Sequence, residues 1–245
     1  MRLFCRGLLL LIIIGTCGCD RPRPLTSKEL PTVKHFYGHV DYFGGQGILD
    51  VHVIASNRFV IGDGLLTTNI TGVSSIVLRK HSRHAWFPFR IWAKKEAPFE
   101  DIWRVMETGA TNRSFELAVR DSDVHEPKLT LLPFSGRASN ERLYFIGCGH
   151  PLFMEATSNL VIVVCDKYHL TFNNSSCRSE DLGLKLWRVK RTTTGMLQIL
   201  ILATGDCPYQ QVIDAVDACN EGAIYLGLLR PSAPLPEIPR EEKNE

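Results

Sequence analysis

The chain has 245 residues, of which 44% are hydrophobic and 22% are charged, and its formal net charge is +2. This length and composition allow one large or two small folded domains and exclude a wholly disordered chain. The near-neutral charge, without a run of lysine or arginine, gives no reason to expect a nucleic-acid partner.

The N-terminus has the pattern of an export signal. Arg2 and Arg6 precede an uncharged stretch, residues 7–18, which is too short for a bilayer span of about 20 apolar residues. The stretch ends in GTCGC, and small residues before a cysteine resemble a bacterial lipobox. We therefore expect residues 1–19 to be a lipoprotein signal and Cys19 to carry lipid, since the glycine before it favours Cys19 over Cys17. The alternative is an ordinary secretory signal that is cleaved nearby.

Two short segments have the composition of irregular chain. Residues 20–32 contain three prolines and the polar sequence TSKE, which predict an extended tether before the first module. Residues 231–245 contain four prolines and end in charged residues, which predicts a disordered tail.

The folded part contains one pattern twice. When Pro98 is aligned with Pro208, Phe99 aligns with Tyr209, and a helix is predicted after each proline. Each helix has apolar residues at i, i+3, i+4 and i+7, which form one buried face. An apolar run precedes each helix, at residues 87–93 and 197–203, and another follows it, at 114–119 and 223–229.

The similarity continues upstream. Residues 49–64 and 160–174 each read as two strands around a short polar turn, which predicts a hairpin. Residues 179–191 then predict a helix with acidic residues in its first turn, and residues 67–80 predict a poorer one that contains glycine and β-branched residues. Each copy therefore reads β-β-α-β-α-β, and we expect an α+β fold of two tandem modules.

The second copy resembles a known family. The run of Asp206, Pro208, Tyr209 and the helix that ends before Gly222 is similar to the closing segment of the periplasmic domain of the ExbD/TolR biopolymer transport family. Glu96, Pro98 and Phe99 repeat this match more faintly. The resemblance implies a small mixed sheet with helices on one face in each module. We assign the first module to residues 33–121, a connecting segment to 122–158 and the second module to 159–230.

The departure from the family limits the function. Proton-coupled members of that family resemble one another in an N-terminal membrane helix with an aspartate, and an ionisable group inside a bilayer normally marks function. Here the apolar segment is short and contains no acidic residue. We therefore expect a lipid-anchored envelope protein with its folded part in the periplasm. It would bind an envelope protein or the cell wall as a scaffold, and its modules would pack as an internal pseudo-dimer.

Candidate chemistry is sparse, and we expect no enzyme activity, cofactor or metal. Cys148 and His150, in GCGHP, are the residues of an alternative thiol-dependent enzyme, although two residues so spaced on a strand lack the geometry of an activated nucleophile. His35 and His39 lack a third metal ligand. A third possibility is a secreted scaffold that is unrelated to the family.

Cysteine pairing stays open from the sequence. Five cysteines follow the signal, at positions 148, 165, 177, 207 and 219, and an exported location would permit disulfides. Cys207 and Cys219 lie about 18 Å apart at opposite ends of one predicted helix, so they do not bond each other. The rest are either buried thiols or contribute one bridge in the second half.

Overall fold

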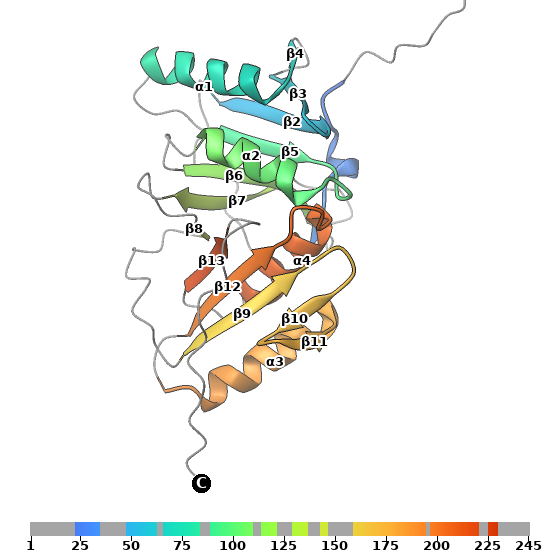
Figure 1. The fold of residues 1–245 in the computed structure, drawn as a ribbon, viewed down its shortest axis with the longest axis vertical. Helices are drawn as coiled ribbons and strands as arrows, with labels where there is room; N and C mark the ends of the chain where they lie inside the picture. Colours follow the sequence, from blue (N-terminus) through green and yellow to red (C-terminus); the bar gives the residue numbers. More distant parts are fainter. Residues whose placement is uncertain are drawn as a thin grey trace, which may run out of the picture.

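Figure 1 shows the fold of a computed structural model, which describes residues 23–34, 48–62, 66–83, 89–109, 114–121, 129–136, 143–146, 159–194, 197–220 and 225–229. The strands are β1 (Thr32–Val33), β2 (Leu49–Ala55), β3 (Arg58–Ile61), β4 (Leu66–Thr68), β5 (Phe89–Ala93), β6 (Ser114–Asp121), β7 (Leu129–Gly136), β8 (Leu143–Ile146), β9 (Leu160–Cys165), β10 (Leu170–Phe172), β11 (Ser175–Cys177), β12 (Gln198–Ala203) and β13 (Tyr225–Leu229). The helices are the 3-10 turn η1 (Ser27–Glu29) and the α-helices α1 (Ile70–Arg83), α2 (Phe99–Gly109), α3 (Ser179–Thr192) and α4 (Tyr209–Asn220).

The thirteen described strands form one mixed sheet, in the order β11-β10-β9-β12-β13-β8-β7-β6-β5-β2-β3-β4, with β1 paired to β6 beside that path. We call residues 49–121 the first half and residues 160–229 the second half. In each half the first strand pairs antiparallel with the second and parallel with the fourth, and the last two strands are parallel. The predicted α+β class is confirmed, and the two halves share one element order and one pairing pattern.

Each half contains one strand more than the sequence analysis predicts. The short strands β4 and β11 pair antiparallel with β3 and β10 just before the first helix of each half. The hairpin turns agree in detail as well. Gly62 and Asn173 stand at equivalent places, both with positive φ, and their N–H groups donate to the carbonyls of Asp50 and Ile162 at 2.9 Å in each case. Glycine and asparagine are the residues that adopt this conformation most readily.

Each of the four α-helices packs an apolar face into the core. In α2 the residues of the predicted stripe, Phe99, Ile102, Trp103 and Met106, are at most 1% exposed, and each contributes about 1.5–3 kcal/mol through burial. The helix α1 forms despite its poorer composition, three residues further along the chain than predicted. Val73 and Val77 are buried against the sheet, and the Asn69 side chain caps the N-terminus by accepting the N–H of Gly72 at 3.0 Å.

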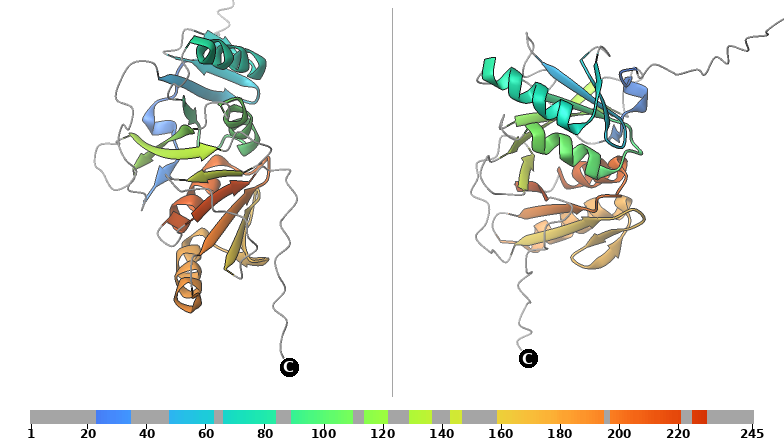
Figure 2. Two further views of the ribbon diagram at one scale, coloured as in Figure 1. Left: turned by 90° about the vertical axis from the view of Figure 1, so that its left-hand side faces the viewer. Right: turned by 45° about the horizontal axis from the view of Figure 1, so that its top comes forward.

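The helices of each half lie on one face of its strands, and the apolar residues between them form a single core cluster across both halves. The left panel of Figure 2 shows the α1/α2 pair on one side of the molecule and the α3/α4 pair on the other. In the same view the N-terminal elements η1 and β1 lie on the α3/α4 side.

The N-terminal segment 23–34 packs against the fold, although the sequence analysis assigns residues 20–32 to an extended tether. Leu25 and Leu30 are buried, Leu30 packs on Ala118 and Trp92, and β1 pairs with the end of β6. The physical reason is that the helix-free face of the first half needs cover, and these leucines provide it.

That face contains a buried polar cluster beneath the segment. The Arg90 guanidinium lies 3.3 Å from the Glu116 carboxylate and 3.9 Å from the Asp50 carboxylate, which also accepts the indole N–H of Trp92 at 2.7 Å. His52 stacks on Trp92 and accepts the backbone N–H of Leu25 at Nδ1. The charges are therefore paired, as burial requires.

Residues 122–158, predicted only to connect the modules, supply two strands of the sheet. β7 pairs with β6, β8 pairs with β7, and β13 pairs with β8, all antiparallel. These two strands join the last strand of the first half to the last strand of the second.

Candidate binding groove

The two halves meet at the turns that start α2 and α4. Pro98 and Pro208 form an isolated antiparallel bridge. Proline has no N–H, so it fits only at a pair whose flanking residues make the hydrogen bonds. Those bonds are present, because the Phe99 N–H donates to the Cys207 carbonyl and the Tyr209 N–H to the Ala97 carbonyl, both at 2.9 Å.

A second pair of hydrogen bonds repeats this arrangement at the next residue of each helix. Glu100 N–H donates to the Gly205 carbonyl at 2.9 Å, and Gln210 N–H donates to the Lys95 carbonyl at 2.8 Å. When Pro98 is aligned with Pro208, Glu100 aligns with Gln210 and Lys95 aligns with Gly205. The two hydrogen bonds are therefore equivalent, with donor and acceptor halves exchanged. The contact therefore has local two-fold symmetry. It also pairs the first N–H groups of both helices, which an isolated helix leaves without partners.

Two adjoining cavities lie beside this junction in the second half, and we call them together the groove. The larger, of about 580 Å³, lies between the β9–β10 turn, the start of α3 and the start of α4, and is lined by Tyr168, His169 and Gln211 among others. The smaller, of about 270 Å³, lies between α3, α4 and Lys34. Ser179, Glu180 and Asp214 line both cavities, which makes the groove continuous.

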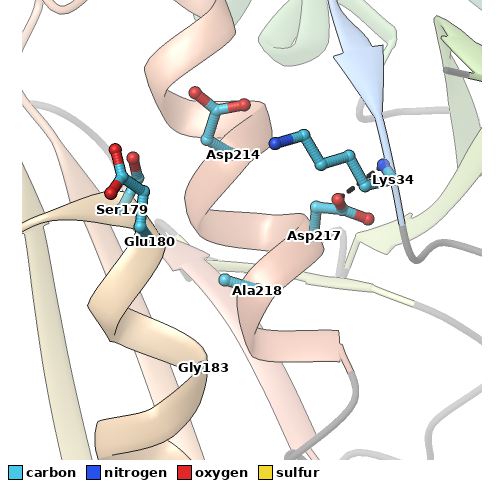
Figure 3. Close-up of a pocket in the computed structure, with 7 residues that line it drawn as sticks. All are labelled: Lys34, Ser179, Glu180, Gly183, Asp214, Asp217 and Ala218. Carbon is cyan, nitrogen blue, oxygen red and sulfur yellow. Dashed lines mark hydrogen bonds between the residues drawn. The ribbon is translucent and has the colours of Figure 1, made fainter.

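The smaller cavity of the groove is lined mainly by polar residues (Figure 3). The Lys34 side chain reaches across the smaller cavity toward Asp214, while its backbone N–H donates to the Asp217 carboxylate at 2.7 Å. Burial raises the pKa of Asp214 above its ordinary value; the Asp217 charge adds to this, and the Gln210 hydrogen bond and the Lys34 charge oppose it. The groove thus presents carboxylates and one ammonium group to a ligand.

Gln210 fixes the N-terminal segment to the wall of the groove. Its side-chain oxygen accepts the Thr32 N–H at 2.9 Å, and its amide nitrogen donates to the Thr32 carbonyl at 3.0 Å and to Asp214 at 2.7 Å. One side chain therefore satisfies both backbone groups of a residue 178 positions away. This contact and the hydrogen bond from the Lys34 N–H to Asp217 hold β1 beside α4.

The equivalent place in the first half is arranged differently. There the tip of the β2–β3 hairpin bonds both helices: Asn57 accepts the Ile70 N–H at the start of α1, and Asp101 of α2 accepts from Ser56 and Asn57. In the second half Asp166 bonds within its own turn, to the N–H groups of Tyr168 and His169. The tip bonds α4 through Gln211, and the groove opens between this tip and the start of α3.

The four described cysteines are free thiols. Burial raises the pKa of Cys207 to about 12 and also raises the pKa values of Cys165 and Cys219. Cys177 is partly exposed and lines the larger cavity. The described part of the second half therefore contains four free thiols and no disulfide.

Several residues singled out in the sequence lie outside the described residues: Cys19, Cys148, His150, His35 and His39. Among the residues that are described, no group of three or more histidine, cysteine or acidic side chains is arranged to hold a metal ion. No helix in the described part of the chain is long and apolar enough to cross a membrane.

The residues that line the groove were not predicted from the sequence. Gln210, Gln211 and Asp214 occupy ordinary polar positions of the amphipathic helix α4, so the apolar pattern does not distinguish them. Comparisons with protein-family models, curated proteins and solved structures find no match.

Proposed function

We propose that the chain is a lipid-anchored envelope protein, tethered at Cys19, whose two halves are copies of one module related to the periplasmic domain of the ExbD/TolR family. In this proposal the copies pack as an internal pseudo-dimer, and the groove of the second half binds an envelope protein or the cell wall. The protein acts as a scaffold and not as an enzyme.

The observation that carries the proposal is the junction at Pro98 and Pro208. The prolines that align the two copies in the sequence are the residues that touch in the fold, and the bonds around them exchange when the halves are exchanged. A repeated element order alone arises in many α+β proteins, whereas this reciprocal contact is expected when two copies of one module pair like a dimer.

The groove supports a binding role. It is open, it adjoins the junction, and its lining combines an exposed aromatic residue, Tyr168, with amide, carboxylate and ammonium groups. Such a lining holds a polar chain by several hydrogen bonds. In the first half, a smaller cavity of about 200 Å³ lies between the end of β2 and the start of α2, and no described residue of α1 lines it.

Two experiments test the proposal separately. The mass of the N-terminal peptide of the mature protein is expected to show Cys19 bearing lipid; cleavage at another position would contradict the anchor. A photo-crosslinking amino acid at Tyr168 is expected to capture an envelope component in cells. The same amino acid at Leu66, which is exposed on β4 of the first half, is the matched control. Equal capture from both positions, or from neither, would exclude the groove as the binding site.

A further inference from the structure

The helix α3 combines exposed apolar residues with a cluster of cations. Leu184 and Trp187 are 51% and 50% exposed, and together they form a small exposed apolar patch. They lie three positions apart, on the same outer face of the helix. Leu182 and Leu186 on the opposite face are buried, so the helix is already packed on the core.

Cations surround these two residues. Arg188 lies beside Leu184 on the helix surface, and Arg191 stacks on the Trp187 ring with its guanidinium carbon 4.1 Å from the ring centroid. Lys190 flanks the same stretch, whereas the Lys185 ammonium donates to the Ser176 carbonyl at 3.3 Å and lies over the Phe172 ring. The acidic residues of the helix, Glu180 and Asp181, are confined to its first turn. The last three turns thus form a positive, partly apolar surface.

We infer that this outer face of α3 docks on an anionic lipid bilayer, with Trp187 and Leu184 at the headgroup level and the arginines against lipid phosphates. Tryptophan prefers the membrane interface, and lysine or arginine beside it adds attraction to anionic headgroups. The face is one convex helix with two apolar side chains. A protein partner would normally require a larger buried core with pockets around its anchor residues.

The inference deepens the proposed function, since it adds a second membrane contact to the proposed lipid anchor. The test uses the full chain reconstituted in vesicles whose acyl chains carry bromine, which quenches nearby tryptophan. The emission due to Trp187 is the difference between the wild-type chain and Trp187→Phe. We expect this emission to be quenched in vesicles that contain phosphatidylglycerol and not in vesicles of phosphatidylcholine alone.

The variant Arg188→Gln/Arg191→Gln is expected to lose this quenching. The matched control Lys28→Gln/Lys95→Gln removes two exposed cations elsewhere and is expected to retain it. Unquenched Trp187 in anionic vesicles, or quenching that survives loss of both arginines, would overturn the inference. Capture of a protein in cells by a photo-crosslinker at Leu184, with Trp187 unquenched, would overturn it in favour of a protein interface. Failure of the lipid anchor is seen independently in the mass of the mature N-terminus.

Discussion

Gln210 offers the sharpest test of how the N-terminal segment is held. Replacement by alanine removes two hydrogen bonds to Thr32 and one to Asp214, at 2.9, 3.0 and 2.7 Å. A typical hydrogen bond contributes about 1 kcal/mol net, and leaving a partly buried backbone group without a partner costs a similar amount. We therefore expect Gln210→Ala to lower the free energy of unfolding by about 2–3 kcal/mol. The assay is urea denaturation, combined with hydrogen exchange of the Thr32 amide, which should accelerate.

The neighbouring Gln211 is the matched control for this experiment. Its amide makes one exposed hydrogen bond, to the His169 carbonyl at 3.0 Å, so Gln211→Ala should cost about 0.5–1 kcal/mol and leave the exchange of Thr32 unchanged. A loss in Gln210→Ala no larger than in Gln211→Ala, or an unchanged Thr32 amide, would refute the reasoning that this side chain fastens the segment.

Four further predictions concern buried groups. The Tyr209 hydroxyl is buried without a hydrogen-bond partner among the described residues, and phenylalanine stands at the equivalent position 99, so Tyr209→Phe should stabilise the protein by about 1 kcal/mol in urea denaturation; a marked loss would reveal an unseen partner. Glu116→Ala should cost about 3 kcal/mol because it removes the main partner of the buried Arg90; a loss below about 1 kcal/mol would contradict that pairing. Because burial raises the pKa of Asp214, its stabilising contribution is complete below the ordinary aspartate pKa and is lost as pH rises through the raised one. Asp214→Asn should therefore stabilise the protein at neutral pH and flatten that decline, and an unchanged pH profile would contradict the shift. In thiol titration near neutral pH, Cys177 should react before Cys165, Cys207 and Cys219, whose pKa values are raised by burial, and simultaneous reaction of all four would disprove the burial argument.

The periodic parts of the fold were predictable from the sequence. The stripes of α2 and α4 and the polar turns of both hairpins are local patterns, and the structure reproduces them. The sequence also aligns Pro98 with Pro208. It contains no sign that these prolines touch, because that contact depends on how two distant segments pack.

The strands β7 and β8 were not predicted within the connecting segment 122–158. Pro133 argues against a strand, since proline cannot donate to a ladder. In the structure it pairs with Glu116 of β6, and the ladder to β8 begins only at Phe134. Pro133 nevertheless lies within β7 beside β6, and only the tertiary structure shows this.

The N-terminal segment and the groove were missed for a similar reason. Three prolines predict an extended chain, which is correct for β1, but composition does not show that Gln210 binds the backbone of Thr32. The groove exists because Asp166 bonds its own turn, whereas Asn57 at the other hairpin bonds the start of α1. Such differences between two similar halves become visible only when the partners are placed in space.

The central claim, that the two halves pair reciprocally at Pro98 and Pro208, is tested most directly by cross-linking them. Residues at such an antiparallel pair have Cα atoms about 4.5 Å apart, within the range that a disulfide spans. In a chain with Cys207→Ala, to prevent mispairing, we expect Pro98→Cys/Pro208→Cys to form an intramolecular disulfide on mild oxidation, identified by mass spectrometry of the linked peptides. A folded double variant whose two introduced thiols stay reduced and separately alkylated would contradict the claim.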